Sequence, residues 1–447
     1  MSGVGFDMKD VNKTQPRYPA VSRAILFIIP SIVITVISII LFSQLTGLSE
    51  AQMNVFSITI ISAIVLSLIG MAGMQVLIYR IIDDRDFFKD GATTRATAIG
   101  FVGSLLFSLI ISASLYPFFS GVLGFSLTEY VIFSTLLLMY SAIWVFASAF
   151  WASEEYTYPA IIFSISYLAI LGFTLFAYNT DHIYTILGYS LGTAILFILL
   201  LLVSAILFPK PETNHKFTGD FSKVFSLASH SGDVIFFSIF YVIAIFLDKI
   251  IVWVYQGLAS GQGLLVTGTY GVGSFLGLIP MFSIAIMVYF TNRTKPLNDE
   301  RYDGTFSEIQ KRVLDYKSVY WSSIGTMLVV ALALFALIAS LSFYYFSDEA
   351  IMRVLVTVSI GSIFFSVIVF NSAVLPIFGK TSISTLAVFF VIIFEILTIP
   401  FVAYDVWYAS LGFLLGSFIG FLISMISTMR LFYHFEHNMF RYLLHSN

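Results

Sequence analysis

Long apolar runs, separated by short polar stretches, dominate the chain. Each run is about 20 residues long, which is the length that an α-helix needs to cross about 30 Å of hydrocarbon. The pattern therefore predicts an all-α integral membrane protein with about twelve transmembrane helices. The predicted spans are Ala24 to Leu45, Met53 to Leu77, Ala96 to Phe119, Tyr130 to Trp151, Pro159 to Ala177, Ile183 to Phe208, Val234 to Tyr255, Tyr270 to Thr291, Tyr320 to Phe346, Ile351 to Ile377, Ser382 to Val402 and Trp407 to Met429.

Composition supports a membrane protein and narrows its chemistry. Of 447 residues, 59% are hydrophobic and only 11% are charged, too few for the surface of a soluble domain. The chain has no cysteine, which excludes disulfides and thiolate metal sites. It also lacks a GxxxxGK phosphate loop, an HExxH motif and a nucleophile elbow. We therefore expect no enzymatic activity, no cofactor or metal site, and no nucleic-acid partner.

Positive charge is distributed asymmetrically between the loops. Twenty of the 22 Lys and Arg residues lie in the N-terminal tail, in the loops after spans two, six, eight and ten, or in the C-terminal tail. These segments all fall on one side of the predicted topology. The positive-inside rule then predicts a multi-pass protein of the cytoplasmic (inner) membrane with both termini in the cytoplasm. Lys249 and Arg353 are the two exceptions.

The two halves of the chain resemble each other. An offset of about 224 places DHIYTILGYSLGTAILF, from Asp181, over DVWYASLGFLLGSFIGF, from Asp405, and aligns Gly188 with Gly412. Six spans per copy give both copies the same orientation, related by an axis along the membrane normal. We therefore expect two six-helix lobes, as in transporters with a central cleft. The predicted segments are a tail at 1–23, an N-lobe at 24–208, a linker at 209–233, a C-lobe at 234–430 and a tail at 431–447.

Charged side chains inside the predicted spans are the main candidates for a transport path. Asp248 and Lys249 lie in span seven and Glu395 in span eleven, each about 20 Å from the cytoplasmic edge. Adjacent helical residues point about 100° apart, so we expect Lys249 to pair with Glu395 rather than with Asp248. Two interpretations stay open: a buried pair that fixes helix packing, or a polar lining of the path.

Span eight is the second candidate for the path. It contains Gly271, Gly277 and Pro280, and the mid-helix proline removes a backbone donor and favours a kink. A bent helix is tolerated in a membrane where it lines a cavity or is buried in protein. The glycines equally fit close helix packing.

The largest cytoplasmic loop, Asn292 to Val319, is predicted to hold a small amphipathic helix. Thr305 and Glu308 form a capping-box pattern at its start. An apolar stripe at helical spacing follows, made of Phe306, Ile309, Val313 and Tyr316. Such a helix lies on the lipid surface or docks a partner.

Several segments resemble a known transporter family. FYVIAIFLDKIIVW (Phe240 to Trp253), the LGLIP of span eight and the TNRTKPLNDERYD after it are similar to the membrane subunit of the Pel exopolysaccharide exporter, the PelG family. YRIIDDRDFF and YHFEHNMF are also similar to cytoplasmic segments of this family. The family resembles a branch of the multidrug/oligosaccharidyl-lipid/polysaccharide (MOP) flippase superfamily.

The resemblance implies a function and a set of partners. It implies export of a polysaccharide or lipid-linked saccharide between the two lobes, a cytoplasmic glycosyltransferase that builds the polymer, and accessory membrane subunits. In the superfamily, spans one, two, seven and eight border the cleft, which would place Asp248 and Lys249 on it. The alternatives are an ion-coupled multidrug or small-molecule antiporter of MOP or major-facilitator type, a major-facilitator-like symporter, and a scaffold that transports nothing.

Overall fold

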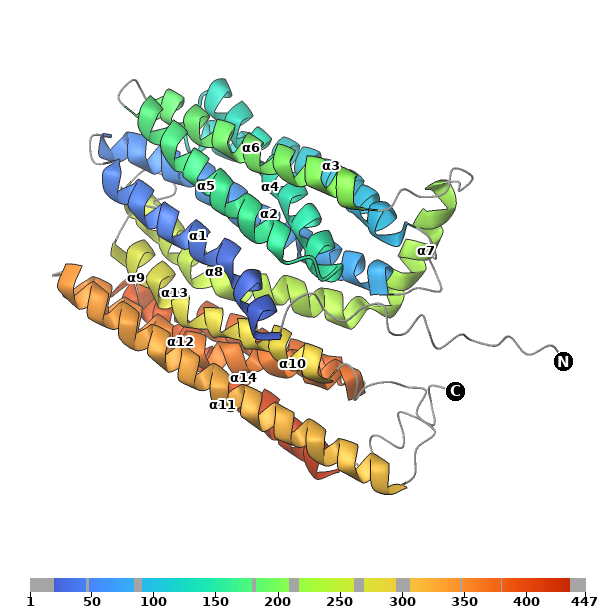
Figure 1. The fold of residues 1–447 in the computed structure, drawn as a ribbon. Coiled ribbons are helices and arrows are strands. Elements are labelled where there is room, and N and C mark those ends of the chain that lie inside the picture. The colour runs from blue at the N-terminus through green and yellow to red at the C-terminus, as the bar shows by residue number, and fades with distance from the viewer. Residues whose placement is uncertain are drawn as a thin grey trace.

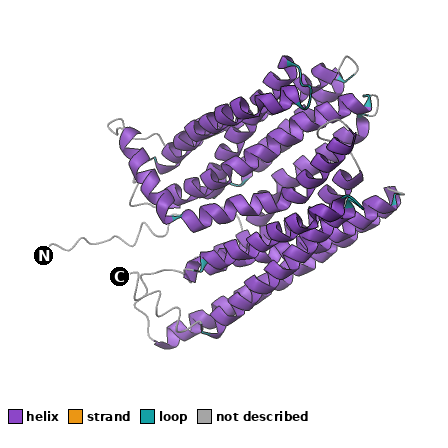
Figure 2. Ribbon diagram, turned by 180° about the vertical axis from the view of Figure 1, so that it is seen from behind, coloured by secondary structure: helices purple, strands orange, loops and turns teal. Residues whose placement is uncertain are grey.

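The computed structural model describes residues 20–45, 48–83, 91–178, 182–208, 217–260, 269–294, 306–345, 348–378 and 380–434. These residues form helices and connecting turns, without a β-strand among them (Figures 1 and 2). Helix α1 (Ala20–Gln44) begins at the same end of the bundle at which helix α14 (Trp407–Tyr433) ends. We call this the terminal end and the opposite one the distal end. The predicted tails at 1–23 and 431–447 lie largely outside the described residues.

The predicted all-α membrane fold is confirmed. Eleven helices of the described ranges are long and apolar enough to cross a membrane, and α1 adds a shorter apolar stretch, Ser22–Ser38. The first half of the chain forms α2 (Glu50–Asp83), α3 (Ala92–Gly121), α4 (Leu127–Ala152), α5 (Thr157–Ala177) and α6 (His182–Leu207). The second half forms α8 (Gly232–Ser260), α9 (Thr269–Gly277), η2 (Ile279–Ala285), α10 (Ile286–Thr294), α11 (Phe306–Tyr345), α12 (Glu349–Val374), η4 (Leu375–Phe378) and α13 (Thr381–Val402).

Two groups of helices pack around separate cores. Helices α1 to α6, the N-lobe, surround one large apolar cluster, and α8 to α14, the C-lobe, surround smaller ones (Figure 1). The groups meet where α2 lies along α8 and where α1 lies along η2 and α10. The lobe boundaries at 24–208 and 234–430 stay a prediction.

Glycines bring the last two helices of each lobe into close contact. A Cβ on Gly192 in α6 would lie 2.5 Å from the Ile170 Cα in α5, and one on Gly416 in α14 would lie 2.6 Å from the Val391 Cα in α13. Only glycine fits at such distances, because no real Cβ tolerates them. The same helix pair is therefore built in the same way twice, as close packing of small residues in lipid requires.

The eighth span is broken in its middle. Pro280 has no backbone N–H, and the α-helix gives way to the 3₁₀ segment η2 between α9 and α10. At the break, the Ser362 hydroxyl of α12 donates a hydrogen bond of 2.9 Å to the Gly277 carbonyl. A Cβ on Gly277 would lie 2.7 Å from the Val358 Cβ. Gly277 thus faces α12, and close packing within the C-lobe accounts for it; Gly271 and Pro280 are buried as well.

The two halves of this span differ in their contacts. Helix α9 packs along α12 inside the C-lobe, whereas α10 packs along both α1 of the N-lobe and α11 of the C-lobe. The predicted interruption at the proline is present, and the part of the span that follows it touches both lobes.

The predicted linker at 209–233 contains a helix that the sequence interpretation missed. Helix α7 (Phe217–His230) lies across the terminal end of the bundle (Figure 1). Val224 is buried against the N-lobe core, and Phe225 is exposed. Apolar residues at 217, 221, 224, 225 and 228 follow a helical period, and this was the available signal.

The prediction of a separate amphipathic helix in the loop before span nine is wrong. Helix α11 runs unbroken over 40 residues, so the predicted stripe forms the start of the ninth span. Val313 and Tyr316 are buried among Phe290, Tyr320 and other residues of the C-lobe, and so they cannot dock a partner. The side chains of Phe306 and Ile309 lie outside the described residues. Val313 and Tyr316 therefore belong to the packing within the chain.

We expect the glycine contact to tolerate no methyl group. Gly192→Ala places a Cβ inside the van der Waals radius of the α5 backbone and should cost about 1–3 kcal/mol. Gly172→Ala in α5 is the matched control, since nothing lies within 4 Å of its Cβ position. The midpoint of thermal unfolding in detergent, followed by tryptophan fluorescence, should fall for the first variant and hold or rise for the second. Equal midpoints would contradict the packing account.

The start of α11 gives a second prediction. Val313→Asp buries an uncompensated carboxylate in the C-lobe and should destabilise the protein by several kcal/mol. Leu314→Asp, one residue further on and 64% exposed, should be close to neutral. Folded protein recovered in the monodisperse peak of a size-exclusion column measures the difference. A well-recovered Val313→Asp protein would restore the idea of a free surface helix.

Candidate functional site

A buried ion pair lies in the middle of α8. Asp248 and Lys249 are both fully buried, and the Lys249 Nζ lies 2.8 Å from the Asp248 Oδ1. The same ammonium donates a second hydrogen bond of 2.8 Å to the backbone carbonyl of Ile245. Both charged residues, and the carbonyl that accepts from Lys249, thus belong to the same helix, α8.

The predicted pairing of Lys249 with Glu395 is therefore wrong. The prediction considered only the angle between neighbouring Cβ atoms. In a helix, Cα–Cβ bonds tilt toward the N-terminus, and the long stem of a lysine carries its ammonium back by one turn. This places the ammonium beside the Ile245 carbonyl, four residues earlier, where the short Asp248 side chain can also reach it.

Tyr270, at the start of α9, completes the coordination of Asp248. Its hydroxyl donates a hydrogen bond of 2.7 Å to the second carboxylate oxygen, Oδ2. The ammonium of Lys249 also lies 6.0 Å from the ring centre of Phe275 and 5.8 Å from that of Phe413, within range of cation–π attraction. The sequence interpretation did not identify Tyr270. Its only signal was its place at the head of the glycine-rich span.

Glu395 in α13 is the third charged residue of this cluster. Its side chain is fully buried, beside the backbone of Asp248 and close enough to Asp248 and Lys249 for their charges to interact. Neither carboxylate oxygen accepts a hydrogen bond from the part of the chain that the structure describes. On the side of α14 it meets Gly412, where a Cβ would lie 2.8 Å from the Glu395 Cα. The structure thus brings all three predicted charges together but leaves one of them unpartnered.

The cluster of Asp248, Lys249, Tyr270 and Glu395, which we call the C-lobe charge cluster, is internal to the C-lobe. Ile245, Val252 and Tyr270 of α8 and α9 belong to an apolar core shared with α12, α13 and α14. In this conformation the cluster therefore does not line a surface between the lobes. A role in transport requires an effect transmitted through the C-lobe rather than direct contact with a large substrate.

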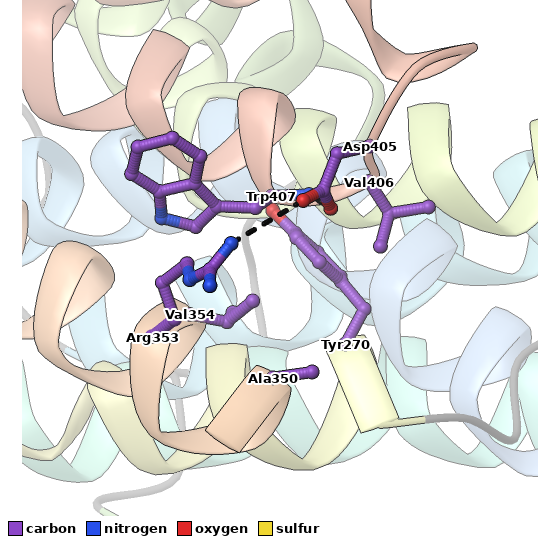
Figure 3. A pocket seen from close by; sticks show the side chains of 7 residues that line it. All are labelled: Tyr270, Ala350, Arg353, Val354, Asp405, Val406 and Trp407. Atoms are coloured by element: carbon purple, nitrogen blue, oxygen red, sulfur yellow. Dashed lines mark hydrogen bonds and ion pairs between the residues drawn. The ribbon is translucent and has the colours of Figure 1, made fainter. Parts of the chain in front are cut away.

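A small cavity at the distal end has one residue of this cluster, Tyr270, in its wall. Its volume is about 30 Å³, and Tyr270 lines it together with Arg353, Asp405 and Trp407 (Figure 3). The Arg353 Nη1 lies 3.5 Å from the Asp405 Oδ2, and the Arg353 guanidinium lies 5.7 Å from the Trp407 ring centre. Both charged side chains are about half exposed. Arg353, the second exception to the charge asymmetry, is thus a surface residue paired with an acid.

Electrostatics restricts what the cluster can do. One ammonium balances one carboxylate, and the pair Asp248–Lys249 already uses both. A second buried carboxylate adds a charge that apolar surroundings do not stabilise. The site therefore combines a buried ion pair with one carboxylate that has no counter-ion of its own.

Comparisons with known proteins agree with this architecture. Residues 1–440 match the model of the PelG family, described as an exopolysaccharide exporter (EPS-E). No curated protein matches the sequence.

Solved transporter structures share the fold. An outward-facing multidrug resistance MATE transporter of the MOP superfamily superposes with a TM-score of 0.65 at 13% identity, covering 92% of this chain and 95% of the other. A MOP superfamily transporter from Pyrococcus furiosus gives a TM-score of 0.64 at 14% identity, with coverages of 92% and 96%. A eukaryotic MATE transporter gives 0.64 at 10% identity, with coverages of 92% and 95%. At these identities the likeness establishes the fold alone.

The observed pairing predicts which double variant recovers stability. Lys249→Met leaves Asp248 buried without its counter-ion and should cost about 3–5 kcal/mol. Adding Asp248→Asn removes the stranded charge and should restore most of the unfolding midpoint. Adding Glu395→Leu instead should not, because Asp248 stays uncompensated. Thermal unfolding in detergent compares the single variant with the two double variants. If stability returned with Lys249→Met plus Glu395→Leu but not with Lys249→Met plus Asp248→Asn, Lys249 would pair with Glu395 after all.

Proposed function

Because the chain belongs to the PelG family of exopolysaccharide exporters, we propose that this multi-pass membrane transporter moves an exopolysaccharide across the membrane between its two lobes. The match of the family model over residues 1–440 carries the proposal, since it covers both lobes and their connection. The two-lobed fold, shared with MOP superfamily transporters, supplies a boundary along which a polymer can pass.

The distribution of basic residues indicates which end of the transporter faces the cytoplasm, and so the direction of export. The basic loops all belong to the terminal end, so we place this end in the cytoplasm. A cytoplasmic glycosyltransferase would then deliver the growing chain at the terminal end, and accessory membrane subunits would assemble around the transporter. The polymer would leave at the distal end.

The described conformation is closed on the terminal side. There α2 lies along α8, and a Cβ on Gly73 would lie only 3.0 Å from the Ile235 Cγ2. In the same half of the bundle α1 lies along α10. The contact between Gly73 and Ile235 is apolar, which suits a seal that opens and closes. We propose that separation of α2 from α8 admits the polymer.

Trp253 supports a path along this boundary. It belongs to α8 but is buried in the core of the N-lobe, and its indole N–H has no acceptor among the described residues. A buried donor without a partner is rare and calls for an explanation. Separation of the lobes would expose both the ring and the N–H, a combination that stacks on a sugar ring and donates to a hydroxyl.

The proposed role of Asp248, Lys249 and Glu395 in transport is indirect. They lie inside the C-lobe, between α8, α9 and α13, and α8 is the helix that carries the contact with α2. A change in the charge balance of the cluster would alter the position of α8 relative to its neighbours. The cluster would thereby bias the terminal seal without touching the polymer.

A disulfide across the seal tests the proposed function. The chain has no cysteine, so Gly73→Cys with Ile235→Cys introduces a single possible bond, at a place where a Cβ on Gly73 would lie 3.0 Å from the Ile235 Cγ2. Oxidation should stop secretion of exopolysaccharide in cells that carry the complete synthesis machinery, and reduction should restore it. Polymer in the medium is measured by lectin binding.

A second pair of cysteines controls for oxidation itself. Ser108→Cys with Ser141→Cys links α3 to α4 inside the N-lobe, where the two hydroxyl oxygens lie 3.2 Å apart. This pair should leave secretion unchanged. Secretion that continues through the oxidised Gly73–Ile235 link would refute passage between the lobes. Loss of dye or drug efflux with unaltered polymer secretion would instead identify an antiporter.

A further inference from the structure

We propose that Glu395 is a proton-binding site inside the C-lobe, loaded from the distal face through the cavity beside Arg353 and Asp405 and through the hydroxyl of Tyr270. Its use as an energy input for export rests on the proposed function. The binding itself does not, and it can be measured without a polymer.

The unpartnered carboxylate carries the first part of the argument. Both oxygens of Glu395 are buried and accept no hydrogen bond from the described residues, while the nearby ammonium of Lys249 is held by Asp248 and by Ile245. A bare carboxylate in such surroundings is strongly disfavoured, and a single bound cation removes the cost. The C-lobe charge cluster has a net charge of one negative unit when both acids are ionised, and one proton makes it neutral.

The neighbours of Glu395 favour a proton over a metal ion. From α8 it faces Asp248 and Lys249, and from α9 it interacts with the more distant Tyr270. Helix α14 presents Gly412 on this side, which carries no side-chain ligand atom. A metal ion would lie beside the Lys249 ammonium and would find one free carboxylate, too few oxygens for a hard cation. A proton needs no further ligand.

The cavity and Tyr270 carry the second part, which is the route. A cavity of about 30 Å³ is large enough to hold water, and its half-exposed charged rim opens at the distal end. The ring of Tyr270 forms part of its wall, and the hydroxyl of Tyr270 donates to the Asp248 Oδ2 at 2.7 Å. The side chain of Tyr270 therefore contacts both the cavity at the distal end and the carboxylate of Asp248 in the C-lobe charge cluster.

The transfer is a simple relay of one proton. A hydronium ion in the cavity gives a proton to the Tyr270 oxygen while the hydroxyl proton moves along its hydrogen bond to Asp248. No hydrogen bond joins the two carboxyl groups in this conformation, so the proton passes from Asp248 to Glu395 in a transient contact, and Tyr270 and Asp248 return to their starting states. The net change is one water left in the cavity and one new O–H bond on Glu395. No other co-reactant is required.

Infrared difference spectroscopy of the full-length protein in lipid nanodiscs tests the site. A protonated carboxylic acid has a carbonyl band separate from that of a carboxylate, and this band should disappear in Glu395→Gln and shift in Glu395→Asp. If the band is absent from the unmodified protein across the accessible acidic and neutral pH range, or unaffected by both variants, the proposal is wrong. Addition of sodium ions should not displace it; displacement would indicate a metal site.

The route is tested by the rate of hydrogen–deuterium exchange of the same band. Tyr270→Phe keeps the ring but removes the relay hydroxyl, and it should slow the exchange by about tenfold or more. Tyr320→Phe is the matched control, since this buried tyrosine of the C-lobe donates to Asn371 instead. Equal slowing in both variants, or in neither, would refute the route. Export is not measured, so a failure here leaves the proposed function untouched.

Discussion

A membrane interior offers no water to groups that the protein leaves unsatisfied, and this constraint shapes each irregular feature of the molecule. Where Pro280 interrupts the eighth span, the Ser362 hydroxyl of α12 donates a hydrogen bond to the Gly277 carbonyl. Where a lysine and an aspartate enter the middle of α8, they neutralise each other and engage a backbone carbonyl and a tyrosine. The apparent exceptions to a helical, apolar protein are therefore locally complete.

Glu395 is a buried charged group of the described chain that lacks such a partner, as the indole N–H of Trp253 does among the neutral groups. The Lys249 ammonium pairs with Asp248 on its own helix and not with Glu395. Of the two buried acids of the cluster, only Asp248 therefore has a counter-ion. Such an imbalance is stable only if it can be relieved by a bound positive charge. Because α8 also carries the contact with the N-lobe, a charge change at Glu395 occurs next to the element that closes the terminal side. Helix α8 thus lies beside Glu395 and also carries the contact that closes the terminal side.

Sequence reasoning identified the elements well and their side-chain contacts less well. Apolar length predicted the spans, since crossing hydrocarbon sets a length that few other structures need. The repeat aligned glycines of the last helix in each lobe, and the structure shows that these glycines make close helix contacts. The residues Asp248, Lys249 and Glu395 were singled out because charge is rare in a span, and the structure buries all three.

The failures have a common origin. Lys249 was assigned the wrong partner because helical angles describe Cβ directions, whereas a flexible four-carbon stem decides where the ammonium lies. The stripe at Val313 and Tyr316 was assigned to a surface because an amphipathic period does not tell whether the apolar face meets lipid or protein. The contribution of Tyr270 depends on how α9 is placed against α8, which follows from tertiary packing alone.

The broken eighth span contacts both lobes, and this has a mechanical consequence. Helix α9 packs against α12, whereas α10 packs against both α1 and α11. A rotation of one lobe against the other would therefore have to break the contact of α10 with one of these neighbours or change the geometry of the seven residues of η2. A 3₁₀ segment has weaker hydrogen bonds than an α-helix, so a change of shape there would cost less than one in a continuous helix.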